Sequence, residues 1–293
     1  MSLRNLLAGH AAVVAPGAYD ALSALLVEQA GFQAVYVSGA SIAYTQLGRP
    51  DIGLVSASEV VNVVARMRDR VAIPLIVDAD TGYGNALNVQ RTVSMLEGAG
   101  ANAIQIEDQQ SPKRCGHLQG KALVTCEEMS GKVRAAVDAR RDPATLIIAR
   151  TDAIAVEGLE GALERAERYL EAGADVLFVE APQSMEQIRA VTGAFARRAP
   201  LVANMVEGGR TPMLSQAQLT DLGFRLVIAP GALVRAFAFM AREFLAVLAE
   251  DGSSARYRDR MVDLAGINAI IGLEDMLSAG VRYGSSERLT AAE

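Results

Sequence analysis

The sequence predicts a single α/β domain of the (β/α)8, or TIM barrel, class, with additional helices at its C-terminal end. Two observations lead to this prediction: short β-branched, apolar runs recur eight times, and stretches with helical periodicity separate them. Eight parallel strands joined by right-handed helical crossovers can close into a barrel, whereas an open doubly wound sheet usually has about five or six strands. The barrel therefore accommodates all eight runs.

The runs that we expect as strands are 13–15, 34–37, 74–77, 103–106, 146–149, 176–179, 201–203 and 226–228. Helical periodicity is clearest at 58–68, 87–97, 127–139, 159–171 and 216–221, which are rich in Ala, Leu, Glu and Arg. A weak repeat supports the alternation, because Gly31, Gly100, Gly173 and Gly223 each precede a strand by a few residues. Glycine there suits the left-handed position that ends a helix.

The length of 293 residues, 51% of them hydrophobic, is enough for one large core and slightly exceeds a typical single barrel. We therefore expect one barrel domain over 1–293. Its segment 253–293, with at least one helix expected near 265–277, goes beyond what a barrel needs. We interpret that segment as a helical extension used in subunit packing, with simple capping of the barrel as the alternative.

Charge and hydropathy exclude several classes of partner. The formal net charge is −6 and no run of Lys or Arg is dense enough to follow a phosphate backbone, which argues against nucleic acid. No apolar stretch reaches the roughly 20 residues that cross a bilayer, and the first ten residues lack the features of a secretory signal. We expect a cytoplasmic protein in which Cys115 and Cys126 remain thiols.

Candidate site residues follow the expected strands where the active site of a barrel forms, at the carboxyl ends. They are Ser38, Gly39 and Ala40 after the second strand, Asp78 and Asp80 after the third, Glu107 and Asp108 after the fourth, Arg150 and Asp152 after the fifth, Glu180 after the sixth and Asn204 after the seventh. Carboxylates from three adjacent strands thus converge on one rim.

Such a group of acids would repel itself unless a cation neutralised it, and a hard divalent ion with oxygen ligands does this most simply. We expect Mg²⁺, with Mn²⁺ as the alternative, bound by Asp78, Asp80 and Glu107. Asp152 is as well explained by a pair with Arg150 or by a helix cap. With only two histidines in the chain, a histidine-rich zinc site is nearly excluded.

Cys115 lies in a polar loop after the fourth strand, next to Lys113 and Arg114. Neighbouring positive charge lowers the pKa of a thiol and makes it a better proton donor or nucleophile. The alternative is a surface loop that contains a cysteine by chance. Cys126 begins a helix after Thr125, the expected cap, and we interpret it as structural.

Six motifs, in this order along 15–235, resemble the isocitrate lyase and phosphoenolpyruvate mutase superfamily. They are YVSG at 36–39, GRPDIG at 48–53, VDADTGYG at 77–84, IEDQ at 106–109, KRCGH at 113–117 and ARTDA at 149–153. The sequence is most similar to the short members of that superfamily, the 2-methylisocitrate and 2,3-dimethylmalate lyases.

The resemblance implies a role for each site residue. Asp78, with Asp80 and Glu107 around it, would bind the metal ion directly or through water. Cys115, Asp51 and Arg150 would be the catalytic residues: Cys115 would protonate the carbanion, and Arg150 would stabilise the negative charge beside it. The substrate would contact Ser38, Gly39, Ala40, Asp51, Gly116, His117, Arg150, Glu180 and Asn204, the first three at the carboxylate of a 2-oxo acid.

The activity implied is a Mg²⁺-dependent lyase that cleaves a 2-hydroxy di- or tricarboxylate to pyruvate and a second carboxylate. The segment 204–212 leaves two alternatives open: an oxaloacetate decarboxylase or hydrolase, and a carboxyphosphonoenolpyruvate or phosphoenolpyruvate mutase. The resemblance also implies a homotetramer that exchanges C-terminal helices between subunits.

Overall fold

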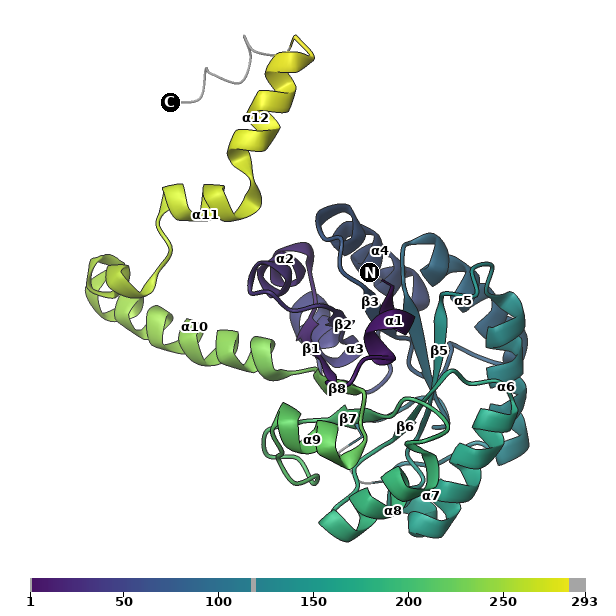
Figure 1. The fold of residues 1–293 in the computed structure, drawn as a ribbon. Coiled ribbons are helices and arrows are strands. Elements are labelled where there is room, and N and C mark those ends of the chain that lie inside the picture. The colour runs from purple at the N-terminus through teal and green to yellow at the C-terminus, as the bar shows by residue number, and fades with distance from the viewer. Residues whose placement is uncertain (1, 117–119, 285–293) are drawn as a thin grey trace. The chain divides into compact units, whose positions relative to one another are not determined.

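A computed structural model of the chain describes residues 2–116 and 120–284. Its eight parallel strands form one sheet in the order β6-β5-β4-β3-β2-β1-β8-β7. A single parallel bridge between Leu177 and Leu201 joins the two ends of this order. The sheet is therefore a nearly closed barrel, and the predicted fold class is confirmed (Figure 1).

Each expected run coincides with one strand. The strands are β1 (Val13–Ala18), β2 (Val35–Val37), β3 (Leu75–Asp78), β4 (Ala103–Glu107), β5 (Leu146–Thr151), β6 (Val176–Val179), β7 (Val202–Asn204) and β8 (Leu226–Ala229). Side chains on nearly every strand position are buried, since one face lines the barrel interior and the other faces the helices. The expected runs at 34–37, 74–77 and 201–203 begin one residue too early.

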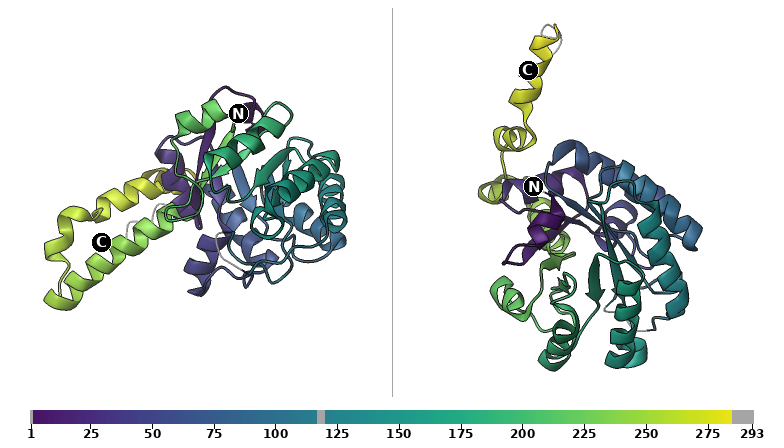
Figure 2. Two further views of the ribbon diagram at one scale, coloured as in Figure 1. Left: turned by 90° about the horizontal axis from the view of Figure 1, so that it is seen from below. Right: turned by 45° about the vertical axis from the view of Figure 1, so that its right-hand side comes forward.

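Helices alternate with the strands and stand outside them, as the views of Figure 2 show for the blue-to-teal part of the chain. The helices of the barrel are α1 (Leu3–Leu7), α2 (Ala21–Gln29), α3 (Gly39–Ile42), the π-helix η1 (Ala43–Leu47), α4 (Ala57–Arg70), α5 (Ala86–Gly98), α6 (Cys126–Ala139), α7 (Ile154–Glu171), α8 (Met185–Phe195) and α9 (Gln216–Leu222). The glycine repeat is confirmed, because Gly31, Gly100, Gly173 and Gly223 have φ values of +85°, +100°, +102° and +104°.

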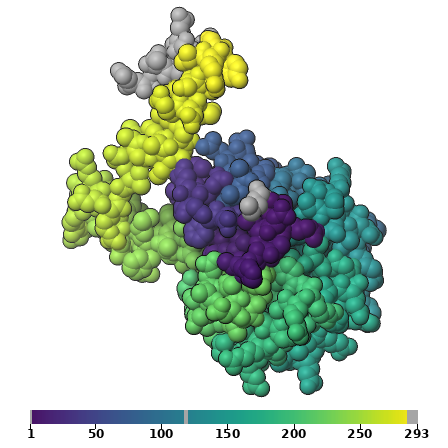
Figure 3. Space-filling view, in the orientation of Figure 1, coloured from purple at the N-terminus to yellow at the C-terminus, as the bar shows by residue number. Residues whose placement is uncertain are grey.

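The short helix α1 closes the amino end of the barrel. Leu3, Leu6 and Leu7 belong to the same buried cluster as the side chains that fill the barrel interior. Arg4 donates hydrogen bonds to the carbonyl of Pro143 and to Asp175, which precede β5 and β6. The N-terminal segment covers this end of the molecule in Figure 3, so the opposite, carboxyl end is where a site can form.

The chain divides into two compact units, 1–234 and 235–293. In the second, α10 (Ala232–Asp251) is followed by a 3-10 helix, η2 (Ala255–Arg260), and by α11 (Leu264–Ile271) and α12 (Leu273–Arg282). The expectation of at least one helix near 265–277 is confirmed by two, α11 and α12, which Gly272, with φ of +79°, separates.

No single helix in the described part of the chain is long and apolar enough to cross a membrane. The bent combination of 255–271 and 273–282 meets the length and composition limits only when its halves are taken together.

Candidate active site

The predicted site residues lie at the carboxyl ends of the strands and are buried. Ser38 follows β2, Asp78 and Glu107 end β3 and β4, Arg150 lies near the end of β5, Glu180 follows β6 and Asn204 ends β7. Since the strands are parallel and nearly closed into a barrel, these positions form one ring of polar side chains. The structure therefore brings the predicted residues together, with the exceptions described below.

Hydrogen bonds from residues inside the barrel hold the Asp78 carboxylate in one orientation. Its Oδ1 accepts hydrogen bonds from Gln105 Nε2 at 3.2 Å and from the backbone N–H of Asp80 at 3.3 Å. Gln105 in turn accepts a hydrogen bond of 3.0 Å from the Tyr36 hydroxyl, and both side chains are fully buried. A Cβ on Gly39 would lie 3.2 Å from Asp78 Oδ2, so glycine at this position lets the chain approach the carboxylate closely.

Lys113 joins two further carboxylates. Its Nζ lies 2.5 Å from Asp51 Oδ1 and 2.9 Å from Asp80 Oδ1. Burial raises the pKa of Asp80 to about 7, the carboxylates of Asp78 and Asp51 add to this rise, and Lys113 opposes it. Burial alone would lower the pKa of Lys113, but the carboxylates around it hold that pKa well above its ordinary value. The Lys113 ammonium therefore pairs with the carboxylates of both Asp51 and Asp80.

Arg150 organises the other half of the ring. Its Nε and Nη2 donate to the two oxygens of Asp152 at 2.9 and 3.0 Å, and its Nη1 lies 3.2 Å from Glu107 Oε2. Glu180 is more distant, at 3.7 Å, and the guanidinium lies over the ring of Phe178. Asp152 therefore pairs with its basic neighbour, as the alternative interpretation of this residue expected.

Asp108 does not belong to the acid cluster, which corrects the expectation that its carboxylate converges with the others. It accepts hydrogen bonds from Thr151 Oγ1 at 2.7 Å, from the Tyr169 hydroxyl at 2.8 Å and from the backbone N–H of Asp152 at 2.9 Å. Successive residues at the end of a strand point to opposite faces, so Glu107 and Asp108 cannot both enter the barrel. Asp108 stabilises the attachment of β4 to β5 and α7.

The buried carboxylates of the ring outnumber its buried cations, and this excess of negative charge fits a small divalent cation. Six buried carboxylates share the ring with three buried cations; these are Asp51, Asp78, Asp80, Glu107, Asp152 and Glu180, and Lys113, Lys121 and Arg150. Glu107 Oε1 accepts no hydrogen bond from the described residues, whereas Asp80 Oδ1 has the Lys113 ammonium as its partner at 2.9 Å. Burial raises the pKa of Glu107 well above its ordinary value, although Arg150 opposes the rise.

No group of three or more His, Cys, Asp or Glu side chains in the described ranges is close enough to enclose an ion alone. An ion here would keep several water ligands, as Mg²⁺ usually does.

The segment with Cys115 lies against the arginine half of the ring. A Cβ on Gly116 would lie 2.4 Å from Arg150 Nη2 and 2.8 Å from Glu180 Cγ, so only glycine permits this approach. Lys121 donates to the Gly116 carbonyl at 2.5 Å and to Asp152 Oδ1 at 2.8 Å. Cys115 is half-buried and both cysteines are thiols. The predicted residue His117 lies outside the described residues.

Ser38 caps α3, since its hydroxyl accepts a hydrogen bond from the backbone N–H of Ser41 at 3.2 Å. Gly39 and Ala40 form the first turn of that helix, beside Asp78 and Asp80. Thr125 caps α6 as expected, and Cys126 is the first residue of that helix.

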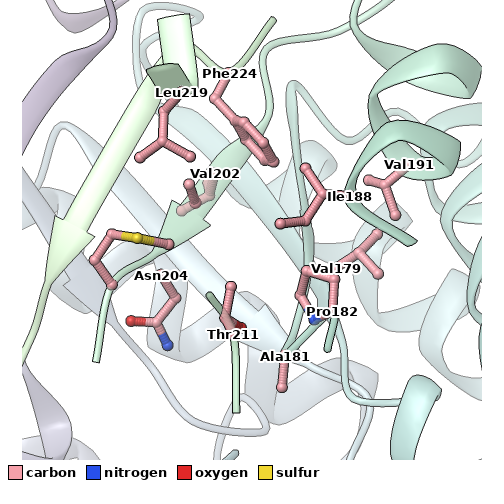
Figure 4. A pocket seen from close by; sticks show the side chains of 12 residues that line it. Val179, Ala181, Pro182, Ile188, Val191, Val202, Asn204, Thr211, Leu219 and Phe224 are labelled. Carbon is pink, nitrogen blue, oxygen red and sulfur yellow. The ribbon is translucent and has the colours of Figure 1, made fainter. Parts of the chain in front are cut away.

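Asn204 connects the ring to a narrow apolar pocket between β6, β7, α8 and α9, shown in Figure 4. Its Nδ2 donates to both oxygens of Glu180, at 3.1 and 3.3 Å. Asn204 Oδ1 and Thr211 Oγ1 are buried without a hydrogen-bond partner in the part of the chain that the structure describes. These two polar groups face a lining that is otherwise almost entirely apolar.

Gln105 and Lys121 were not anticipated as site residues. Gln105 had a signal in the sequence, because it is the polar residue within the apolar run 103–106 and its period-two neighbours face the barrel. Lys121 had none, since an isolated lysine in a loop carries no pattern.

Comparison with known proteins identifies the family. Residues 3–248 match the family model of phosphoenolpyruvate phosphomutase. The chain is 48% identical to 2-methylisocitrate lyase of Aeropyrum pernix, over 93% of this chain and 87% of that protein. It is 41% identical to 2,3-dimethylmalate lyase of Eubacterium barkeri, over 97% of both.

Solved structures agree. A 2,3-dimethylmalate lyase, described as a member of the PEP mutase/isocitrate lyase superfamily, has a TM-score of 0.91 and 36% identity over 99% of this chain and 96% of its own. Oxaloacetate acetylhydrolase in complex with 3,3-difluorooxalacetate has a TM-score of 0.90 and 34% identity, over 97% of this chain and 96% of its own. Phosphonopyruvate hydrolase in complex with oxalate and Mg²⁺ has a TM-score of 0.87 and 33% identity, over 96% of this chain and 97% of its own. The chain therefore belongs to the phosphoenolpyruvate mutase and isocitrate lyase superfamily, among its carbon–carbon lyases.

Proposed function

We propose that this chain cleaves a 2-hydroxy di- or tricarboxylate of the 2-methylisocitrate or 2,3-dimethylmalate type to pyruvate and a second carboxylate, in a Mg²⁺-dependent reaction. The observation that supports this most is the approach of Gly116 to Arg150 and Glu180, which brings the segment of Cys115 to a ring of buried acids. The two curated relatives described above carry the names of these two lyases.

Asp78, Asp80 and Glu107 would hold Mg²⁺, or Mn²⁺ in its place, partly through water. The Glu107 oxygen that lacks a hydrogen-bond partner among the described residues supports this assignment, as does the excess of buried carboxylates over buried cations. When bound, the ion would neutralise the excess negative charge and polarise the oxygens of the substrate.

In this proposal the protein's own residues bind the substrate and move its protons. The 2-oxo acid half rests on Ser38, Gly39 and Ala40, and the second carboxylate half contacts Gly116, His117, Glu180 and Asn204. Because the ring is buried, water has little access to the reacting carbon atoms.

Asp51, held by Lys113, accepts the proton of the substrate's 2-hydroxyl. The O–H electron pair forms the carbonyl of pyruvate, and the bond between C2 and C3 breaks. Its electron pair moves to the carbon next to the second carboxylate, where Arg150 stabilises the negative charge. The Cys115 thiol donates its proton to that carbon, and the thiolate and Asp51 then return to their starting protonation states.

The experiment that tests this function measures pyruvate release from 2-methylisocitrate, 2,3-dimethylmalate and oxaloacetate, with Mg²⁺ and with a chelator. We expect Mg²⁺-dependent release from one of the two hydroxy acids. Release confined to oxaloacetate, after correction for its spontaneous decarboxylation, would contradict the proposal.

One observation favours a second candidate, the hydrolysis or decarboxylation of oxaloacetate: the fold matches an oxaloacetate acetylhydrolase as closely as it matches a lyase. The substrate panel separates the two functions when oxalate is measured beside pyruvate, because hydrolysis of oxaloacetate yields oxalate and acetate rather than pyruvate. A phosphonate mutase or hydrolase activity is the third alternative, to be tested with phosphonopyruvate.

We also propose that the chain forms a homotetramer with exchanged C-terminal helices, in a reducing compartment such as the cytoplasm where Cys115 stays a thiol. Large apolar side chains on the C-terminal helices are exposed in the single chain, including Phe237, Phe239, Leu245, Leu264, Met276 and Val281. Light scattering should give four times the chain mass of 30.9 kDa. A monomer at micromolar concentration would contradict the assembly.

A further inference from the structure

We propose that Lys121 is a positioning residue, which fixes the Gly116 peptide, and with it Cys115, against Arg150 and Glu180. The Lys121 ammonium lies 2.5 Å from the carbonyl oxygen of Gly116 and 2.8 Å from Asp152 Oδ1. It therefore links the segment that carries the thiol to the strand that carries Arg150.

The burial of this lysine needs an explanation. The Lys121 side chain is 1% exposed and that of Asp152 is 0% exposed. Removing an ammonium group from water costs several kcal/mol, so buried lysines are rare unless they are paired. Asp152 already has a bidentate partner in Arg150, and a second cation is not required to satisfy its two oxygens. What Lys121 adds is the bond to the Gly116 carbonyl.

That bond determines where the neighbouring residue lies. The Gly116 backbone is packed so closely that a Cβ there would overlap Arg150 Nη2 and Glu180 Cγ. A peptide in such close contact with two charged groups needs an attractive contact to hold it, and the described residues supply one through Lys121. Without the ammonium group, the Gly116 carbonyl would lose a charge-assisted hydrogen bond in a buried place.

This inference rests on the proposed function, in which Cys115 donates a proton to the cleaved carbon. Proton transfer depends steeply on distance and direction, and a displacement of about 1 Å can cost a factor of about 100 in rate. Lys121 would therefore influence turnover without touching the substrate.

A purely structural ion pair is the competing explanation for Lys121. It predicts that loss of the lysine lowers stability but leaves the reactivity of the Cys115 thiol unchanged. The two explanations differ in thiol reactivity, so the experiment measures that quantity directly.

The test uses Lys121→Met and Lys121→Arg in the full chain with Cys126→Ala, so that Cys115 is the one thiol present. The rate of alkylation by iodoacetamide reports the position of Cys115 independently of catalysis. The matched control is Arg140→Met, which removes the cation that pairs with Asp175 at the amino ends of the strands. It should leave alkylation and kcat unchanged.

We expect Lys121→Met to accelerate alkylation about tenfold and to lower kcat about 100-fold, with a small change in KM and unchanged Mg²⁺ affinity. Lys121→Arg keeps a cationic donor, so its kcat and its alkylation rate should both return most of the way to the values of the unsubstituted chain. Should Lys121→Met fail to fold, Lys121→Gln carries the same test.

Alkylation and kcat at the values of the unsubstituted chain in the Lys121 variants would overturn the inference, whatever happens to stability. If the unsubstituted chain releases no pyruvate from either hydroxy acid, the proposed function fails. The alkylation rates still decide the role of Lys121 in that case.

Discussion

Gln105 donates a hydrogen bond of 3.2 Å to Asp78 from the neighbouring strand, deep inside the barrel. Both oxygen and nitrogen of its side-chain amide are used, because the Tyr36 hydroxyl donates to Gln105 Oε1. The amide can therefore take only one orientation, and Asp78 receives a fixed donor. In the proposed function, a carboxylate held in this way offers its second oxygen to the metal ion.

Gln105→Leu should weaken Mg²⁺ binding, because Asp78 would lose the donor that orients it. Residues that support a metal ligand in this way typically contribute a factor of about 10 to 100 in affinity. Titration calorimetry with Mg²⁺ measures this effect. Tyr36→Phe is the matched control, since it removes the outer hydrogen bond alone and should reduce affinity less. Equal affinities in Gln105→Leu and the unsubstituted chain would refute the orienting role.

Asp78→Asn and Asp108→Asn should have opposite consequences although both remove a buried carboxylate. The first should abolish the response of activity to Mg²⁺ and change thermal stability little. The second should keep the Mg²⁺ response and lower the free energy of unfolding by about 1–3 kcal/mol, because the Thr151 and Tyr169 hydroxyls lose a charged acceptor. Denaturant titration and Mg²⁺-dependent rates distinguish them, and a shared phenotype would contradict the division of roles.

Gly116→Ala should lower kcat by about 100-fold, because the added methyl group would displace the segment from Arg150 and Glu180. The control is Gly193→Ala in α8, where nothing lies within 4 Å of the added Cβ. That change should leave kcat unaltered and raise stability by up to about 1 kcal/mol, since alanine favours a helix. If Gly116→Ala behaved like the control, the close approach would have no functional role.

Cys115→Ser should reduce kcat by a factor of about 100 to 10,000, because a hydroxyl is a far weaker proton donor than a thiol. Binding of pyruvate in the presence of Mg²⁺ should persist, since the contacts to the 2-oxo acid remain. Steady-state kinetics test the loss of kcat, and a titration with pyruvate tests the retained binding. Unchanged turnover would remove Cys115 from the mechanism.

The barrel could be predicted because its signal is local and repeated. Each apolar run, such as 176–179, is bounded by helical periodicity, and the glycine at 31, 100, 173 and 223 marks the helix ends. The position of the break at Gly272 could not be predicted, since one glycine inside an amphipathic stretch is tolerated in many helices. Strand starts were misplaced by one residue where an apolar residue precedes the strand.

The site could be predicted in position but only partly in detail. Strand order placed Asp78, Glu107 and Arg150 on one rim. The direction of Asp108 was wrong, because sequence alone did not fix which of two adjacent acids enters the barrel. Lys121 could not be found, since its partner Asp152 is 31 residues away and the pair forms only after folding.

The central claim is that carbon–carbon cleavage ends in protonation of the second carboxylate at its former C3, and a reaction in D2O tests it most directly. With 2,3-dimethylmalate or 2-methylisocitrate and Mg²⁺, NMR should find one deuterium on the former C3 of the second carboxylate and none, at early times, on the pyruvate methyl group. Deuterium confined to the pyruvate methyl group, with oxaloacetate as the one substrate consumed, would contradict the account and indicate decarboxylation instead.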